Sequence, residues 1–193
     1  MKVVHPKKSY NKIRNSFRVF NRAISYLWSV FYIDIYFGNF WNFREYIIKN
    51  NLVNVGHKFE SYYYYYLESK NSFIGLHTMI KGTPTLPHGL CGIFISESAV
   101  IGEGVTIFQN VTIGSNLLPD SKNNGAPKVG DNCVIGANAV LIGNINVGNN
   151  VRVGAGTTVY KDVPCDSTVV SRNLEIIQHL AKKDNSFVPN NIV

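Results

Sequence analysis

Few side chains in this sequence are suited to catalysis, and the most promising is a histidine in a turn-rich segment. His88 lies in the stretch LPHGLCG, residues 86–92. A neutral imidazole is the usual proton acceptor at physiological pH, so it can take the proton of a hydroxyl group that attacks a carbonyl carbon. Taken alone, a single histidine in a turn is more often a surface residue than a general base. Whether His88 is a surface residue or a general base therefore depends on the elements that position it.

The cysteines and the common nucleotide motifs point to no other chemistry. Cys91, Cys133 and Cys165 are widely spaced and form no CxxC pair, so we expect neither a zinc site nor a disulfide framework. This favours a reduced, cytoplasmic compartment. The sequence contains neither GxxxxGK[ST] nor GxGxxG, the phosphate-binding motifs of many nucleotide sites. We therefore predict a protein that requires no metal.

The 193 residues fall into two parts of different composition, with the boundary near residue 70. Residues 1–70 hold 11 Lys/Arg and 4 Asp/Glu, whereas residues 71–193 hold 8 of each, so the first part accounts for the whole net charge of +7. The first part also holds 19 of the 24 aromatic residues but only two of the 16 glycines. A chain that is 45% hydrophobic is not disordered, so both parts are expected to fold.

The first part contains apolar residues at helical spacing, with Arg14, Arg18 and Arg22 between them. These apolar residues are Phe17, Phe20, Ile24, Leu27, Trp28, Phe31 and Ile35. The pattern predicts an amphipathic helix, and two interpretations of its apolar stripe stay open. The stripe packs on a neighbouring element, or residues 14–43 make a peripheral contact with the inner face of the cell membrane, with Trp28, Tyr32, Phe37 and Trp41 at the interface.

Other roles for the first part are disfavoured. The apolar run of residues 24–37 is shorter than the roughly 20 residues that span a bilayer, and no signal-peptide cleavage pattern predicts secretion. Basic composition without a zinc-finger, RRM or helix-turn-helix signature does not indicate nucleic-acid binding.

The second part contains a six-residue repeat. Its aliphatic positions are Ile95, Ile101, Ile107 and Ile113, then Val129, Ile135, Leu141, Val147, Val153 and Val159. A helix favours a period near 3.6 and a flat strand a period of two. A period of six instead indicates a parallel β-helix, in which each unit is one strand and one turn and three units close a triangular coil. We interpret the glycines that follow the aliphatic residues as turn glycines, and Cys133 as an inward-facing core residue.

Two interruptions of the repeat lie where function is expected. Ten extra residues enter within the polar loop 115–128, and a bulge between Leu86 and Ile95 contains His88. A loop that leaves a regular coil is usually functional. We therefore divide the chain into a helical region (1–72), a coil domain (73–164) and a tail (165–193) with a short helix near Leu174–Lys183.

The segments LPHGLCGIFISESAVIGEGVTIFQNVTIG and APKVGDNCVIGANAVLIGNINVGNNVRVGAGTTVYKDVP resemble the hexapeptide-repeat acyltransferases. Within that family they are most similar to the serine acetyltransferases and the capsule and O-antigen O-acetyltransferases. The resemblance implies a mainly β fold, a left-handed β-helix, a homotrimer, and acetyl-CoA bound in the groove between subunits. It assigns the general base to His88 and a supporting role to Glu97. For acetyl-CoA it indicates Gly114, Ser115, Ala137 and Ala155, with Arg152 near the CoA phosphates.

The sequence departs from the serine acetyltransferases at positions that hold the amino acid. Pro87 replaces an acidic residue, Gly125 and Ala126 replace an Arg-His pair, and the region of an orienting aspartate holds Phe73. The loop instead offers polar groups for an acceptor: Asn116, Asp120, Ser121, Asn123 and Asn124. We therefore predict acetyl transfer to a sugar hydroxyl of a bacterial surface polysaccharide or its precursor, with serine O-acetyltransferase as the alternative.

Two alternatives to acetyl transfer remain. A carbonic anhydrase built on the same coil needs three histidine ligands for one zinc ion, whereas the coil region offers His77 and His88 alone. The other alternative is a non-catalytic coil that serves as a trimer scaffold.

Overall fold

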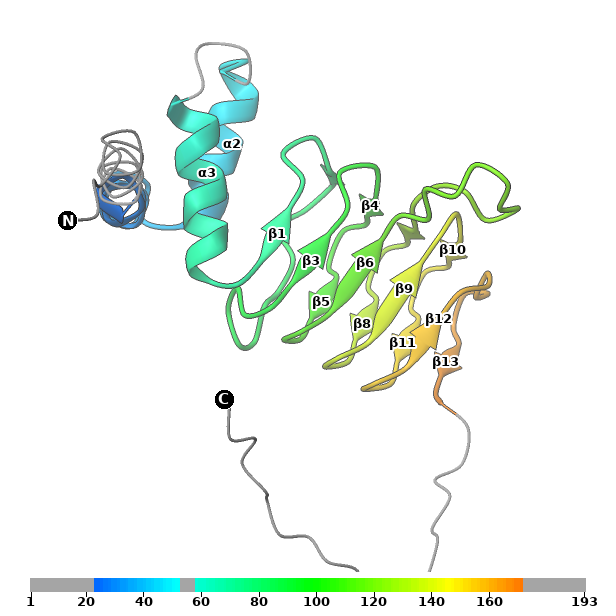
Figure 1. Cartoon of the computed structure of the whole chain (residues 1–193). Helices are drawn as coiled ribbons and strands as arrows, with labels where there is room; N and C mark the ends of the chain where they lie inside the picture. Colours follow the sequence, from blue (N-terminus) through cyan, green and yellow to red (C-terminus); the bar gives the residue numbers. More distant parts are fainter. Residues whose placement is uncertain (1–22, 53–57, 172–193) are drawn as a thin grey trace, which may run out of the picture.

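The computed structural model describes residues 23–52 and 58–171, which form a parallel β-helix with helices at one end (Figure 1). The helical elements are residues 23–32, continuing into the π-helical turn η1 (Ile33–Phe37), then α2 (Phe40–Lys49) and α3 (Lys58–Ser69). The predicted tail helix and the first residues of the apolar stripe lie outside the described residues.

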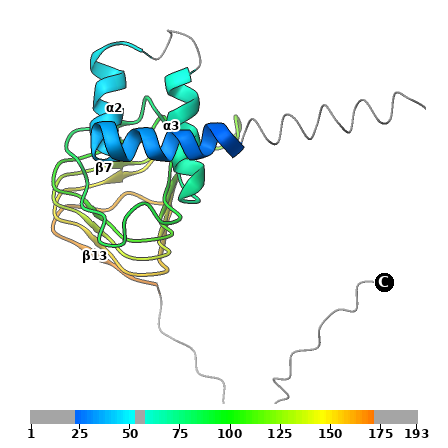
Figure 2. The same ribbon diagram turned by 90° about the vertical axis from the view of Figure 1, so that its left-hand side faces the viewer.

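The strands form three sheets, one on each face of a triangular coil (Figures 1 and 2). The first sheet has β1 (Phe73–Ile74), β3 (Phe94–Ile95), β6 (Thr112–Gly114), β9 (Val140–Ile142) and β12 (Thr158–Val159). The second has β2 (Met79–Ile80), β4 (Val100–Ile101), β7 (Lys128–Val129) and β10 (Asn146–Val147). The third has β5 (Thr106–Ile107), β8 (Val134–Ile135), β11 (Arg152–Val153) and β13 (Thr168–Val169). All neighbouring strands within these sheets pair in parallel.

The register confirms the six-residue repeat and its two interruptions. Val134 pairs with Arg152, eighteen residues later (152 − 134 = 18), so three units close one coil. The step from Val100 to Lys128 is 28 residues (128 − 100 = 28) because the loop adds ten. The step from Phe73 to Phe94 is 21 (94 − 73 = 21) because the bulge that contains His88 adds three.

The core of the coil consists of the predicted aliphatic columns, whose side chains are at most 4% exposed. They are Ile95, Ile101, Ile107, Ile113, Val129, Ile135, Leu141, Val147, Val153 and Val159. Cys133 is also fully buried, as predicted, and its Sγ donates to the carbonyl oxygen of Gly148 at 3.1 Å. Burial raises the pKa of this thiol, so Cys133 is a packing residue rather than a nucleophile.

The prediction that the repeat glycines are turn glycines is wrong for most of them. Gly102, Gly130 and Gly136 do not have positive φ; instead, a Cβ on each would lie 2.4–2.6 Å from an atom of the next coil. Other residues of the coil adopt the left-handed turn conformation: asparagines such as Asn110 and Asn138, with φ of 58° and 59°, and glycines such as Gly104 and Gly156, both with φ of 67°. Asparagine tolerates this conformation better than other side chains with a Cβ. The repeat glycines therefore serve the close stacking of coils.

The helices cover the first coil through polar contacts to its backbone. Arg44 of α2 is buried, and its Nη2 donates to the carbonyl oxygens of Thr78 at 2.5 Å and Leu76 at 3.2 Å. Tyr63 of α3 donates from its hydroxyl to the carbonyl oxygen of Ile74 at 3.0 Å. The first coil has no preceding coil to satisfy these carbonyls, so Arg44 and Tyr63 take that place.

The apolar stripe of residues 23–35 faces away from the other described elements. Ile24, Leu27, Trp28, Phe31 and Ile35 are 39–68% exposed. The interpretation that this stripe packs on a neighbouring element is therefore wrong for these residues within the described chain.

The four aromatics predicted to lie at a membrane interface do not share one face. Tyr32, Phe37 and Trp41 are partly buried against the helical core, whereas Trp28 is exposed. No helix among the described residues is both long enough and apolar enough to cross a membrane.

Candidate active site

His88 is held in a tight turn anchored on the third sheet. Thr85 forms a parallel bridge with Thr106, and the backbone N–H of Gly89 donates to the carbonyl oxygen of Leu86 at 3.0 Å. Gly89 has a φ of 66° and open space around it, so a glycine allows the turn to close without strain. The three extra residues of the bulge thereby present His88 on the surface, beside the corner that follows β5.

The side-chain amide of Gln109 determines which ring nitrogen of His88 carries the hydrogen. Nδ1 of His88 lies 2.6 Å from Oε1 of Gln109. A carbonyl oxygen accepts and does not donate, so Nδ1 carries the hydrogen and Nε2 carries the lone pair. Phe108 meets the imidazole edge-on, with ring centroids 5.8 Å apart. Nε2 makes no hydrogen bond within the described part of the chain, which is the state required of a general base.

Gln109 belongs to a column of residues that stack along one corner of the coil. The backbone N–H of Asn138 donates to the carbonyl oxygen of Gln109 at 3.1 Å, and that of Gly156 donates to the carbonyl oxygen of Ala137 at 2.8 Å. Gln109, Ala137 and Ala155 therefore occupy equivalent places on successive coils. The structure brings His88 together with two of the predicted acetyl-CoA residues at this corner.

The two alanines leave donors free at that corner. The backbone N–H groups of Ala137 and Ala155 donate to no group in the described ranges. A row of free N–H groups beside small side chains fits the carbonyl oxygens of an extended ligand. Arg152 projects from the third sheet, is exposed, and forms no ion pair with the described residues. This set fits the pantetheine and phosphate groups of CoA.

Gly114 and Ser115 lie at a different corner, between the first and second sheets. Ser115 and Ser96 share a hydrogen bond between their hydroxyl oxygens at 2.5 Å. Glu97 follows at the same corner, but it contacts His77 rather than His88: its Oε1 lies 3.9 Å from His77 Nε2. Glu97 is therefore not the group that orients His88 within one chain. That group is Gln109.

The polar side chains of the loop mostly hold the loop itself together. Asn116 donates from Nδ2 to Ser121 Oγ at 2.8 Å, Asn123 to the carbonyl oxygen of Tyr160 at 3.1 Å, and Asn124 to that of Leu118 at 3.0 Å. Of the predicted acceptor residues, Asp120 is exposed and makes no hydrogen bond within the described ranges. Each of the three amides thus has a structural hydrogen bond, and their role in binding an acceptor stays a prediction.

The described chain shows no candidate metal centre. No group of three or more His, Cys, Asp or Glu side chains lies close enough to hold a metal ion in residues 23–52 and 58–171. His77 and His88 stand at different corners of the coil.

Sequence reasoning missed Gln109. A glutamine two residues after a core isoleucine looks like any polar turn residue, and nothing in its spacing marks it. Its role becomes visible only when the coil register places it beside His88, 21 residues earlier in the chain.

Comparisons with known proteins agree with this architecture. Residues 126–161 match the family model described as bacterial transferase hexapeptide (six repeats). A serine acetyltransferase of Staphylococcus aureus (strain Mu50 / ATCC 700699) is 40% identical over 99 residues, which cover 51% of this chain and 43% of that protein.

Solved structures similar to this chain are also named serine acetyltransferases. The serine acetyltransferase of Neisseria gonorrhoeae in complex with serine has a TM-score of 0.55 and 28% identity, covering 69% of this chain and 52% of that one. A serine acetyltransferase in complex with CoA has a TM-score of 0.53 and 27% identity, covering 67% and 50%. The chain thus spans about half the length of the proteins it matches. The left-handed β-helix of hexapeptide repeats is confirmed, and the matched proteins are serine acetyltransferases.

These comparisons correct the predicted acceptor. The relatives and solved structures described above are named serine acetyltransferases, so the prediction of a polysaccharide O-acetyltransferase is wrong and its alternative is favoured. A sugar is favoured when charged groups are missing at the positions of Pro87, Gly125 and Ala126. The described chain nevertheless carries a half-exposed carboxylate, that of Glu97, at the corner where the loop begins.

Proposed function

We propose that this chain transfers the acetyl group of acetyl-CoA to the hydroxyl group of serine. The observation that carries the proposal is the pairing of His88 with Gln109 at 2.6 Å, which leaves Nε2 as the proton acceptor. The similarity to serine acetyltransferases, including one solved with serine and one with CoA, supports the choice of substrates.

The proposed reaction uses His88 first as a base and then as an acid. Nε2 takes the hydroxyl proton while the hydroxyl oxygen attacks the thioester carbonyl carbon. The C–S bond then breaks, and the departing CoA sulfur receives the proton from the imidazolium. Proton transfer of this kind contributes on the order of 10²–10⁴ in rate, and alignment of the two substrates supplies much of the rest.

The working enzyme is a homotrimer in this proposal. His88, Ala137 and Ala155 lie at one corner of the triangular coil, whereas Gly114 and Ser115 lie at another. Side chains at different corners of one coil can line a common groove when the coils of two subunits stand side by side. Leu117 and Leu118 of the loop are 80% and 63% exposed, which agrees with a loop that a neighbouring subunit covers.

Serine carries an ammonium and a carboxylate group that the site must accommodate. The positions that hold Pro87, Gly125 and Ala126 contribute no charge. In this proposal Glu97, a half-exposed carboxylate at the second corner, pairs with the ammonium group of serine across the subunit interface.

The test is thiol release from acetyl-CoA by the full chain, with and without L-serine. We expect serine to accelerate release and His88→Ala to lower kcat by about 10²-fold or more. Cys91→Ser is the matched control because Cys91 is an exposed residue of the same bulge, and it should retain at least about half of the activity. A His88→Ala variant as active as Cys91→Ser would refute the assignment of the base.

The acceptor is tested separately in the same assay. Thiol release that other small hydroxyl compounds stimulate but L-serine does not would reject serine while retaining acetyl transfer. No release above hydrolysis with any acceptor would reject the proposed function.

A further inference from the structure

The amino-terminal helix presents an apolar face that no other part of the described chain covers. Leu27, Trp28, Phe31 and Ile35 are 68%, 55%, 54% and 60% exposed. They follow one another at steps of one, three and four residues, so they form one stripe on the helix. Four large apolar side chains exposed side by side mark a contact surface rather than ordinary surface variation.

The opposite face of the same helix fixes its orientation. Ser29 and Ile33 are fully buried, and the ring of Tyr32 contacts those of Phe43 and Tyr62, with centroids 6.4 and 5.9 Å apart. The helix lies across α2 and α3 as the outermost element at that end of the molecule (Figure 2). If the helix were rotated about its axis so that the stripe became buried, Ile33 would become exposed. The stripe therefore faces outward.

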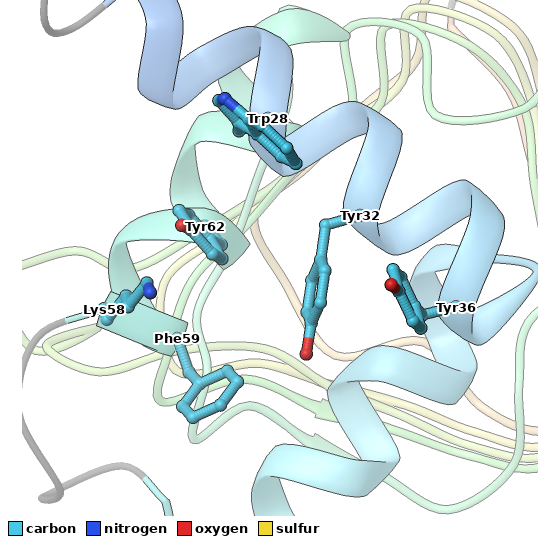
Figure 3. A pocket seen from close by; sticks show the side chains of 6 residues that line it. All are labelled: Trp28, Tyr32, Tyr36, Lys58, Phe59 and Tyr62. Atoms are coloured by element: carbon cyan, nitrogen blue, oxygen red, sulfur yellow. The ribbon is translucent and has the colours of Figure 1, made fainter.

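The stripe adjoins a second aromatic surface that carries a cation. Trp28 borders a hollow of about 280 Å³ that α3 closes on its other side (Figure 3). The hollow is lined by Trp28, Tyr32, Tyr36, Lys58, Phe59 and Tyr62. The ammonium nitrogen of Lys58 lies 5.9 Å from the centroid of the Tyr62 ring. Tryptophan, tyrosine and lysine together are typical of surfaces that sit at the boundary of lipid and water.

The net charge of the chain lies immediately before this surface. Residues 1–22 contain seven Lys/Arg and no Asp/Glu, whereas the rest of the chain contains 12 of each (19 − 7 = 12 basic, 12 acidic). The whole excess of +7 therefore precedes an exposed apolar stripe in the sequence. Each basic residue near an anionic lipid surface contributes about 1 kcal/mol of attraction.

We propose that the stripe Leu27–Trp28–Phe31–Ile35 docks on an anionic phospholipid bilayer, with residues 1–22 providing the electrostatic attraction. The helix lies in the plane of the membrane surface, and its four apolar side chains enter the boundary between headgroups and acyl chains. A second copy of the chain is the less favoured occupant, because it would bring its own seven cations to the same contact. This inference does not depend on the proposed acetyl transfer.

The first experiment is co-sedimentation of the full chain with vesicles. One set contains phosphatidylcholine alone and the other phosphatidylcholine with phosphatidylglycerol. We expect binding to the anionic vesicles at least about tenfold stronger than to the neutral ones, and progressively weaker binding as salt rises from 0.05 to about 0.5 M. Equal binding to both vesicles, or no binding to either, would overturn the proposal.

Substitutions in the apolar stripe test whether vesicle binding requires these side chains in addition to the basic residues. Leu27→Glu with Phe31→Glu places two carboxylates on the docking face and should lower anionic-vesicle binding by about tenfold or more. Val170→Glu is the matched control, because Val170 is 67% exposed near β13, at the end of the coil far from the helices. Equal binding by the two proteins would contradict docking through the stripe. Loss of a dimer in the Leu27→Glu/Phe31→Glu protein, without vesicle binding by the wild type, would assign the stripe to a second copy.

Tryptophan fluorescence tests whether the stripe enters the membrane without a substitution in the stripe itself. The chain has two tryptophans, so Trp41→Phe leaves Trp28 as the single reporter. We expect its emission to shift to shorter wavelength with anionic vesicles and to be quenched by brominated acyl chains. Emission that remains that of water-exposed indole, in a protein that sediments with the vesicles, would place the contact elsewhere.

Discussion

The chemistry of this protein centres on one imidazole and the amide that orients it. In the Nδ1–H form, His88 has its proton acceptor on Nε2, and Gln109 selects that form by accepting a hydrogen bond at 2.6 Å. A free imidazole exchanges between its two neutral forms, and only one of them carries the lone pair on Nε2. Gln109 is therefore a positioning residue for His88.

Replacement of Gln109 tests this role at the scale of one hydrogen bond. Gln109→Leu keeps the side-chain volume roughly but removes the acceptor, so we expect kcat for thiol release to fall about tenfold with little change in KM for acetyl-CoA. Gln109→Glu retains an acceptor oxygen and should recover most of the loss.

Two controls make the Gln109 result specific. Circular dichroism and the oligomeric state should be the same for the wild type and both variants, because Gln109 contributes its backbone carbonyl to the stacking of coils whatever its side chain. If Gln109→Leu and Gln109→Glu lose activity equally, orientation by an acceptor is refuted.

At the scale of elements, the coil is specified by two separate properties of the repeat. Aliphatic side chains fill the column inside, and small residues allow one coil to approach the next. Gly130 illustrates the second property: an added Cβ would lie 2.4 Å from Asn149 Oδ1 and 2.7 Å from the backbone carbon of Gly148. Backbone atoms of the neighbouring coil cannot move aside without disturbing its hydrogen bonds.

Gly130→Ala should therefore lower the free energy of unfolding by about 2 kcal/mol, measured as a lower urea midpoint. Gly114→Ala is the matched control, because its added Cβ would meet only a methyl group of Thr112 at 3.6 Å, an ordinary contact. The control should change the urea midpoint little. Equal midpoints for the two variants would show that coil spacing adjusts to a methyl group.

The β-helix could be predicted from the sequence because the aliphatic residues that form its core recur every six residues. Each aliphatic residue from Ile95 to Val159 has the same environment, so one rule predicts all ten. The bulge and the loop were also predictable, as breaks in that rule. The function of the repeat glycines was not, because close approach to another coil and a left-handed turn both favour glycine. Only the backbone angles distinguish them.

The candidate site was less predictable because it depends on contacts between coils. Ala137, Ala155 and His88 were placed by resemblance, and the structure brings them to one corner. Gln109 had no sequence signal, and Glu97 was assigned to His88 although it contacts His77 at 3.9 Å. The outward direction of the stripe around Trp28 could not be deduced either. That helix has a second apolar set, which includes Ile33, and packing decides which set is buried.

At the scale of the whole molecule, the proposed site is divided between two corners of the coil. One corner carries His88 and Gln109, and the other carries the loop that begins at Ser115. A closed ring of three identical chains repeats one heterologous contact three times, so each groove would combine the first corner of one chain with the second corner of the next. Two chains with different defects can then assemble one intact groove.

A mixing experiment tests this division of the site. The first variant is His88→Ala. The second replaces residues 117–124 by an Asn-Gly turn, which the antiparallel bridge between Asn116 and Gly125 can accept as a two-residue hairpin. Each variant alone should be inactive. Refolded together in equal amounts, they should recover about one quarter of wild-type activity, because half of the grooves receive an intact His88 and half of those an intact loop. Activity no greater than the sum of the separate variants, in mixed trimers verified by mass, would place the whole site within one chain.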